Sequence, residues 1–201
     1  MVIEHFYATK RESLMQLFLN SDYYKVEWIY TGNLFLITHS LHEALLTAEK
    51  NRLHPAKEKI MLNLAHIYEK NDSPEDAIKW YKRCLNEPHF SPEHYQADIL
   101  ASLILNMIEC REYSQIDEYM MKLSLIKRIQ EPCLRDSLNA LKFFLHAKIG
   151  YSLKNIPDEE IKSLLAQSRM VYQETAVFSL MIPLDSMIEE MNGDLSNSNK
   201  D

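Results

Sequence analysis

The residues best suited to metal chemistry are two histidines near position 40. His39 and His42 are three positions apart, so both fall on one face of a helix and offer two imidazole ligands. The carboxylate beside them is Glu43, but Ala-Leu-Leu follows it where a His-Glu-x-x-His zinc site needs its second histidine. In addition, no glutamate in the chain has a histidine three residues later, the spacing of helical di-iron sites. We therefore predict surface histidines, no metal site and no cofactor.

Nucleophilic catalysis has one weak candidate. Cys84 is followed by His89 and His94, the two histidines within ten residues of it in the sequence. Both histidines come after Pro88 in a predicted loop, and no orienting acid or oxyanion donor is evident. The acidic run Asp158-Glu159-Glu160 is typical of a first helical turn, where carboxylates complement the helix dipole. We predict that the protein is not an enzyme and has no catalytic residue.

The glycine content excludes the common phosphate-binding loops. The 201 residues include only three glycines, Gly32, Gly150 and Gly193, and the closest pair is 43 residues apart. Walker loops, Rossmann fingerprints and G-x-S-x-G elbows all need two glycines within a few residues. The hydrophobic fraction of 46% is that of a globular protein. The length predicts one domain, or at most two.

Charge, cysteine content and hydropathy bear on compartment and partners. Against 29 acidic residues stand 22 Lys and Arg, with never more than two adjacent, which opposes direct binding to nucleic acid. The three cysteines are at least 23 residues apart and form no C-x-x-C motif, so we expect small buried hydrophobes. Glu4 and His5 stand where a signal peptide needs apolar residues, and the longest uncharged stretch, fifteen residues from Trp28 to His42, is too short to span a bilayer. These features predict a soluble, intracellular, cytoplasmic protein that does not bind membranes.

Prolines and N-capping serines divide the chain into helices. Five prolines stand just ahead of long apolar-periodic segments, where a first-turn proline loses no hydrogen bond: Pro55, Pro74, Pro92, Pro132 and Pro157. The predicted helices are 10–20, 23–37, 40–52, 56–70, 74–86, 92–110, 114–129, 132–149, 158–174 and 176–191, the last kinked or split by Pro183. Short connections favour antiparallel neighbours. We predict an all-α fold with one domain over 1–194 and a disordered tail over 195–201.

An internal repeat is visible when the chain is shifted by 33 residues. The shift places Gly32 on Ala65, Phe35 on Tyr68, Ala44 on Ala77, Ala48 on Tyr81 and Pro55 on Pro88. A copy shifted by 39 residues keeps the apolar positions as Leu103, Met107, Ile116, Met120 and Leu123. With Trp28 or Leu64 at its start, this order of a small residue, an aromatic, a small Ala and a closing Pro resembles the tetratricopeptide repeat. The resemblance implies antiparallel helix hairpins stacked as a short right-handed solenoid, with repeats over 25–57, 58–91 and 97–130 and divergent helices over 132–191.

In such a solenoid the first helices of successive repeats line a concave surface. One polar stripe on the second repeat is Lys59, Asn63, His66 and Lys70, with spacings of 4, 3 and 4. The equivalent stripes are Val26, Tyr30, Asn33 and Ile37 in the first repeat, Asp98, Ser102, Leu105 and Glu109 in the third, and Arg135, Asn139, Lys142 and His146 on helix 132–149. The predicted partner-binding groove consists of Tyr30, Asn33, Ile37, Asn63, His66, Lys70, Ser102, Leu105 and Glu109. The alternative interpretation is that these stripes are merely solvated faces.

The family resemblance also suggests a carboxylate clamp for acidic chaperone tails. Asn33 and Asn63 match that clamp, but Ile29, Asp98 and Ser102 stand where its cations belong, so we predict no such binding.

A secondary interface is predicted at Trp80, Met181 and Met187. Trp80 points about 100° away from Tyr81 on a helix, which places it either in an interface or against the preceding hairpin. Methionines gather in the C-terminal half and suit exchangeable surfaces, through which a homo-oligomer can form.

These observations favour a non-catalytic adaptor or scaffold that binds a peptide or helix of a partner protein. The alternatives are a peptide-sensing or transcription-regulatory repeat protein, and a secretion chaperone for an exported client.

Overall fold

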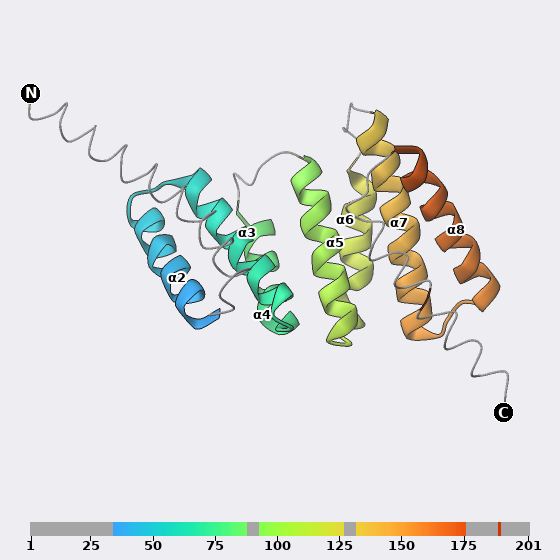
Figure 1. Cartoon of the computed structure of the whole chain (residues 1–201), viewed down its shortest axis with the longest axis horizontal. Helices are drawn as coiled ribbons and strands as arrows, with labels where there is room; N and C mark the ends of the chain where they lie inside the picture. The colour runs from blue at the N-terminus through green and yellow to red at the C-terminus, as the bar shows by residue number, and fades with distance from the viewer. Residues whose placement is uncertain (1–33, 88–92, 127–131, 176–188, 190–201) are drawn as a thin grey trace, which may run out of the picture. The chain divides into compact units, whose positions relative to one another are not determined.

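The computed structural model describes residues 34–87, 93–126, 132–175 and 189 (Figure 1). Over these residues it has seven α-helices, one short 3₁₀ helix and no strand, which confirms the all-α class. The chain divides into two compact units between residues 91 and 92. The single domain over 1–194 and the solenoid arrangement stay predictions. The predicted helices 10–20 and 176–191 and the tail 195–201 lie outside the described residues, apart from residue 189.

The described part of the first unit consists of α2 (Leu34–Lys50), α3 (His54–Lys70) and α4 (Pro74–Leu85). Helix α3 packs against both of the others, and short turns join each helix to the next (Figure 1). Pro55 and Pro74 lie in the first turns of α3 and α4, as expected of a residue without a backbone N–H. The predicted bounds of both helices agree with the structure within two residues.

The core of the α3–α4 pair contains the small residues of the repeat. Ala65 and Ala77 are 0% exposed, and so are Leu64 and Tyr81. Small side chains allow two helices to approach closely. The predicted burial of both alanines is confirmed.

Helix α2 corrects the prediction of two helices at 23–37 and 40–52. It runs without a break through residues 38 and 39, and neither Gly nor Pro interrupts it. Thr38 Oγ1 donates to the Leu34 carbonyl at 2.8 Å, a bond within a continuous turn. As a result Phe35 and Ala44 lie on one helix rather than on opposite arms of a hairpin. Phe35 is 80% exposed, so it fills no gap between helices in this structure.

The described part of the second unit consists of α5 (Glu93–Glu109), the 3₁₀ helix η1 (Tyr113–Gln115), α6 (Ile116–Leu125), α7 (Pro132–Leu153) and α8 (Asp158–Thr175). Helix α5 packs on α6 and α7, and α7 packs on α8. The Ser168 hydroxyl is fully buried and donates to the Ala140 carbonyl at 2.8 Å, which joins α8 to α7.

Two predicted ends in the second unit are wrong. Helix 114–129 stops at Leu125, because Ile126 has an extended backbone with ψ 97°. Helix 132–149 continues to Leu153, since Gly150 does not end it. A Cβ at Gly150 would lie 2.3 Å from Ile156 Cδ1, so the glycine makes room for the side chain of the following turn.

Four helices end in turns of the same kind, and none of these turns has glycine at its left-handed position. Arg52, Asp72, Arg111 and Lys154 have φ between 50° and 57°, in the left-handed region. The next backbone N–H bonds to the carbonyl five residues earlier: Leu53 to Ala48 at 2.9 Å, Ser73 to Tyr68 at 3.0 Å, Glu112 to Met107 at 2.8 Å and Asn155 to Gly150 at 3.4 Å. This is the Schellman arrangement, which most often places glycine at the left-handed position. It closes α2, α3, α5 and α7.

Candidate functional site

Helix α5 presents one accessible stripe. From residue 97 to residue 109 every side chain is buried except Asp98, Ser102, Leu105 and Glu109. Asp98 and Glu109 are exposed, and the other two are half-buried. The spacings of 4, 3 and 4 place all four on one face of the helix. This is the pattern of exposure that the sequence predicts for α5.

The predicted groove residues of the first unit have different environments. Tyr30 and Asn33 lie outside the described residues. Ile37 is 0% exposed and Asn63 is 5% exposed, so the prediction that these two line an open groove is wrong for this structure. Ile37 is buried because it belongs to the apolar face of the continuous helix α2. On α3, Lys70 is exposed and His66 is half-buried.

Within each unit, the structure places the described groove residues on one helix face. Asn63, His66 and Lys70 share one face of α3, and Ser102, Leu105 and Glu109 share one face of α5. A groove continuous from α3 to α5 stays a prediction.

His66 takes part in the packing of α3 on α4. Its ring meets the ring of Tyr81 edge-on, with centroids 5.9 Å apart. The hydroxyl of Tyr81, which is fully buried, donates a hydrogen bond to Glu69 on α3. His66 is therefore tied to the hairpin core, and Lys70 is the freely accessible member of this face.

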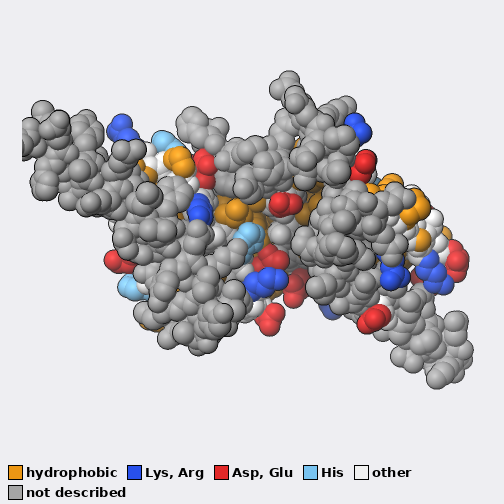
Figure 2. All heavy atoms as spheres, turned by 45° about the horizontal axis from the view of Figure 1, so that its top comes forward, with side chains coloured by type: hydrophobic (Ala, Val, Ile, Leu, Met, Phe, Trp, Pro, Cys, Tyr) orange, Lys and Arg blue, Asp and Glu red, His pale blue; other side chains and the backbone are white. Residues whose placement is uncertain are grey.

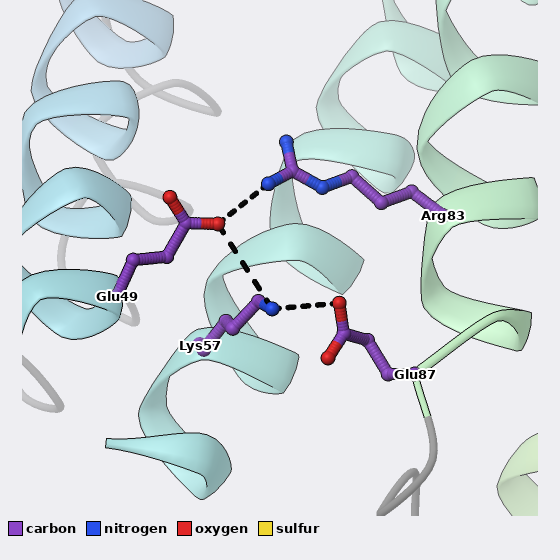
Figure 3. A network of polar contacts seen from close by, with 4 residues as sticks. All are labelled: Glu49, Lys57, Arg83 and Glu87. Atoms are coloured by element: carbon purple, nitrogen blue, oxygen red, sulfur yellow. Dashed lines mark hydrogen bonds and ion pairs between the residues drawn. The ribbon is translucent and has the colours of Figure 1, made fainter. Parts of the chain in front are cut away.

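A network of four charges joins the three described helices of the first unit (Figure 3). Lys57 on α3 lies between Glu49 on α2 and Glu87 just after α4, with Nζ–Oε1 distances of 3.9 Å and 2.6 Å. Glu49 also accepts a hydrogen bond from Arg83 on α4 at 2.6 Å. The side chains of Lys57 and Glu87 are only 18% and 19% exposed. Two acids and two bases satisfy one another here, so the network stabilises the packing and offers no unpaired charge to a ligand.

Sequence reasoning missed this network. Its members are 34 residues apart in the pair Glu49–Arg83 and 30 residues apart in the pair Lys57–Glu87. These separations are close to the repeat length, and opposite charges at that separation were the one signal that could have revealed the network.

Trp80 packs on α2, the first described helix of its unit. The ring of His42 on α2 meets it edge-on at 5.3 Å, and the Arg83 guanidinium lies over the indole at 5.0 Å from the ring centroid. The side chain is half-buried. Two roles are predicted for Trp80, an interface and packing against the preceding hairpin. The structure shows Trp80 packed against α2, which lies in the segment predicted for that hairpin.

The candidate catalytic and metal-binding residues are engaged elsewhere. His39 stacks on Phe35, and His42 Nδ1 lies 2.6 Å from the Thr38 carbonyl oxygen. Burial raises the pKa of the Cys84 thiol to about 12, so the reactive thiolate is suppressed. Among the residues that the structure describes, no three His, Cys, Asp or Glu side chains come together as a metal site.

Burial shifts the pKa of three other groups. It raises the pKa of Tyr68, with a further contribution from the nearby Asp76 carboxylate, and it raises the pKa of Tyr119. It lowers the pKa of Lys142 on α7. All three shifts follow from the cost of holding a charge in a partly desolvated position.

Large apolar side chains are exposed on several helices. On the face shown in Figure 2, apolar, acidic and basic side chains of the described residues lie interspersed. The most exposed large apolar residues are Phe35, Leu46, Met121, Leu125, Leu153 and Met170. Met181 and Met187 of the predicted secondary interface lie outside the described residues. Within 34–87, 93–126 and 132–175, no helix is both long and apolar enough to cross a membrane.

Comparisons with known proteins return no match: no family model, no curated protein and no solved structure resembles this chain at a significant level. The resemblance to the tetratricopeptide repeat therefore rests on the residues of the chain itself.

Proposed function

We propose that this protein is a non-catalytic interaction module, built from stacked helix hairpins, that binds a peptide or helix of a partner protein. The observation that carries the proposal is the stripe on α5. Between residues 97 and 109 this helix keeps Asp98, Ser102, Leu105 and Glu109 accessible and buries all the remaining side chains. Burying the polar groups of Ser102 and Glu109 without partners would cost free energy, so this accessible face suits a polar ligand.

The contents of the stripe suit a protein ligand. Leu105 is half-buried between two polar neighbours, so the stripe combines apolar contact area with hydrogen-bonding groups. Mixed composition of this kind is typical of protein interfaces. Lys70 is exposed on α3 and Glu109 is exposed on α5, and each charge would select the register of a segment bound to its own helix more than the affinity of that segment.

A pull-down with a charge-reversed variant tests the proposal. The full-length protein is used as bait in a lysate of the source organism, and captured proteins are identified by mass spectrometry. The variant Lys70→Glu with Glu109→Lys keeps the net charge and should lose the partner while its melting temperature stays close to that of the parent. The matched control is Lys50→Glu with Glu43→Lys, which reverses two exposed charges on α2.

The decisive comparison is between this groove and the C-terminal methionines. If the groove variant captures the partner normally while changes at Met181 or Met187 abolish capture, the C-terminal segment is the binding site and the proposed groove is wrong.

A further inference from the structure

A second accessible stripe runs along α7 and combines cations with apolar residues. Arg135, Asn139 and His146 are exposed, and Lys142 is half-buried. The same line continues through the half-buried Ile149 to Leu153, which is 40% exposed. The spacings along it are 4, 3, 4, 3 and 4, so all six residues share one face of the helix. We call this face the α7 strip.

The opposite side of α7 is committed to the core. Leu138, Leu141, Phe144 and Leu145 are buried, since α7 packs on both α5 and α8. The α7 strip is therefore a continuous accessible face that runs from Arg135 to Leu153.

The cations of the α7 strip differ from four lysines that lie on other helices. Lys57, Lys79, Lys122 and Lys162 each form an ion pair with a carboxylate. In contrast, Arg135, Lys142 and His146 form no ion pair with any carboxylate that the structure describes. The pKa of Lys142 is lowered by burial alone, so its ammonium group is partly desolvated, and it pairs with no carboxylate of the described residues. A carboxylate brought to this position would compensate a desolvation cost that the fold already bears.

We propose that the α7 strip binds an amphipathic acidic helix of a partner protein, with carboxylates opposite Arg135, Lys142 and His146 and apolar residues opposite Ile149 and Leu153. The strip is a single straight row, and a second helix presents side chains in a row of the same spacing. From Arg135 to Leu153 the row is about 27 Å long at 1.5 Å per residue, so it accommodates about five turns. This inference rests on the proposed function, because it specifies the chemistry of the partner.

The net charge of the whole chain has the same sign as the proposed acidic ligand. Its net charge is −7, so an acidic ligand is repelled by the average field of the chain. Binding of an acidic peptide therefore requires a local site rather than a general attraction.

Fluorescence anisotropy with designed peptides tests the inference on the full-length chain. The probe is a labelled helical peptide with three glutamates and two leucines. The second glutamate comes seven residues after the first, and the third comes four residues after the second. The leucines come three and seven residues after the third glutamate. The same peptide is also made in reverse order, because the partner helix can run in either direction. The matched control peptides have glutamine in place of each glutamate.

We expect one of the two glutamate peptides to bind and its glutamine counterpart to bind at least about tenfold more weakly. The variant Arg135→Glu with Lys142→Glu should weaken the glutamate peptide at least about tenfold. Lys142→Gln should give a smaller loss, and it serves where the double reversal fails to fold. Lys50→Glu, an exposed lysine of α2, should leave binding unchanged. Added salt should also weaken binding, because exposed charges are screened.

The inference is overturned if neither glutamate peptide binds, if glutamine peptides bind equally well, or if the Lys142 variants bind like the parent. Self-association that Lys142→Glu abolishes would also overturn it, since the occupant would then be a second copy. The Lys142→Glu variant can still capture a partner that the Lys70 and Glu109 reversal no longer captures. That result refutes this inference and leaves the proposed function standing. A partner that is lost with Lys142→Glu but kept with the Lys70 and Glu109 reversal supports this inference and overturns the α5 stripe as the binding site.

Discussion

Replacing Ala77 with leucine is the most direct test of the α3–α4 packing. Ala77 is 0% exposed on α4, and the facing helix α3 contributes Leu64 and Ala65, which are also 0% exposed. An isobutyl group in place of a methyl group has no free volume to enter at such a position. It must displace neighbouring side chains or separate the helices, which typically costs about 1–3 kcal/mol.

The expected change is large enough to measure. In a chain of this size each kcal/mol shifts the melting temperature by about 2–4 °C, so Ala77→Leu should melt about 2–12 °C below the parent. Thermal unfolding followed by far-ultraviolet circular dichroism measures this shift. The matched control is Ala166→Leu on α8, the same chemical change at an exposed position, which should stay within about 0.5 kcal/mol of the parent.

If Ala77→Leu melts with the parent, Ala77 does not lie at a close helix–helix contact. The reasoning from small residues to hairpin packing would then be wrong for α3 and α4. A loss in Ala166→Leu as large as that in Ala77→Leu would show that the substitution acts by some route other than packing.

Three further predictions concern ion pairs, alkaline stability and metals. Lys57→Met should lower the free energy of unfolding, measured by urea titration, by about 1–3 kcal/mol, because it leaves the partly buried Glu87 unpaired. Lys79→Met, which removes an exposed ion pair, should have no measurable effect in the same titration. The Cys84 thiol has a folded pKa of about 12 against an ordinary 9, so the folded state holds its proton more tightly. Stability should therefore fall as pH rises from 9 towards 12, by about 1 kcal/mol near pH 10, and this fall should be smaller by that amount in Cys84→Ala. Treatment with a chelator should leave the melting temperature and partner capture unchanged, and stoichiometric zinc or iron in fresh protein would contradict the prediction of no metal site.

Local features of the sequence determined most of the helices. Pro74 and Pro132 each begin a helix, because a first-turn proline loses no hydrogen bond. The stripe on α5 was also predictable, since polar residues at spacings of 4 and 3 in an otherwise apolar segment leave only one face for solvent. The burial of Ala65 and Ala77 followed from the repeat pattern. The first two of these inferences depend on residues within a few turns of one another, and the third depends on a pattern repeated after 33 residues.

The predictions that failed concern long-range packing or backbone conformations that residue types do not encode strongly. Nothing in the residues near Thr38 distinguishes two short helices from the single helix α2, because the choice depends on the surface against which Ile37 packs. The turns at Arg52 and Lys154 adopt a left-handed conformation without glycine, so the usual signal for a helix end is missing.

The pairing of Glu49 with Arg83 joins residues 34 positions apart, and no local pattern shows which of the many charges will meet. The sequence by itself determined which segments are helical and which residues face one another within a turn. Only the tertiary structure decided that Ile37 and Asn63 are covered and which charges are paired. Burial and ion pairing depend on contacts between segments far apart in the chain, and the free energies of those contacts are set by the whole packed core.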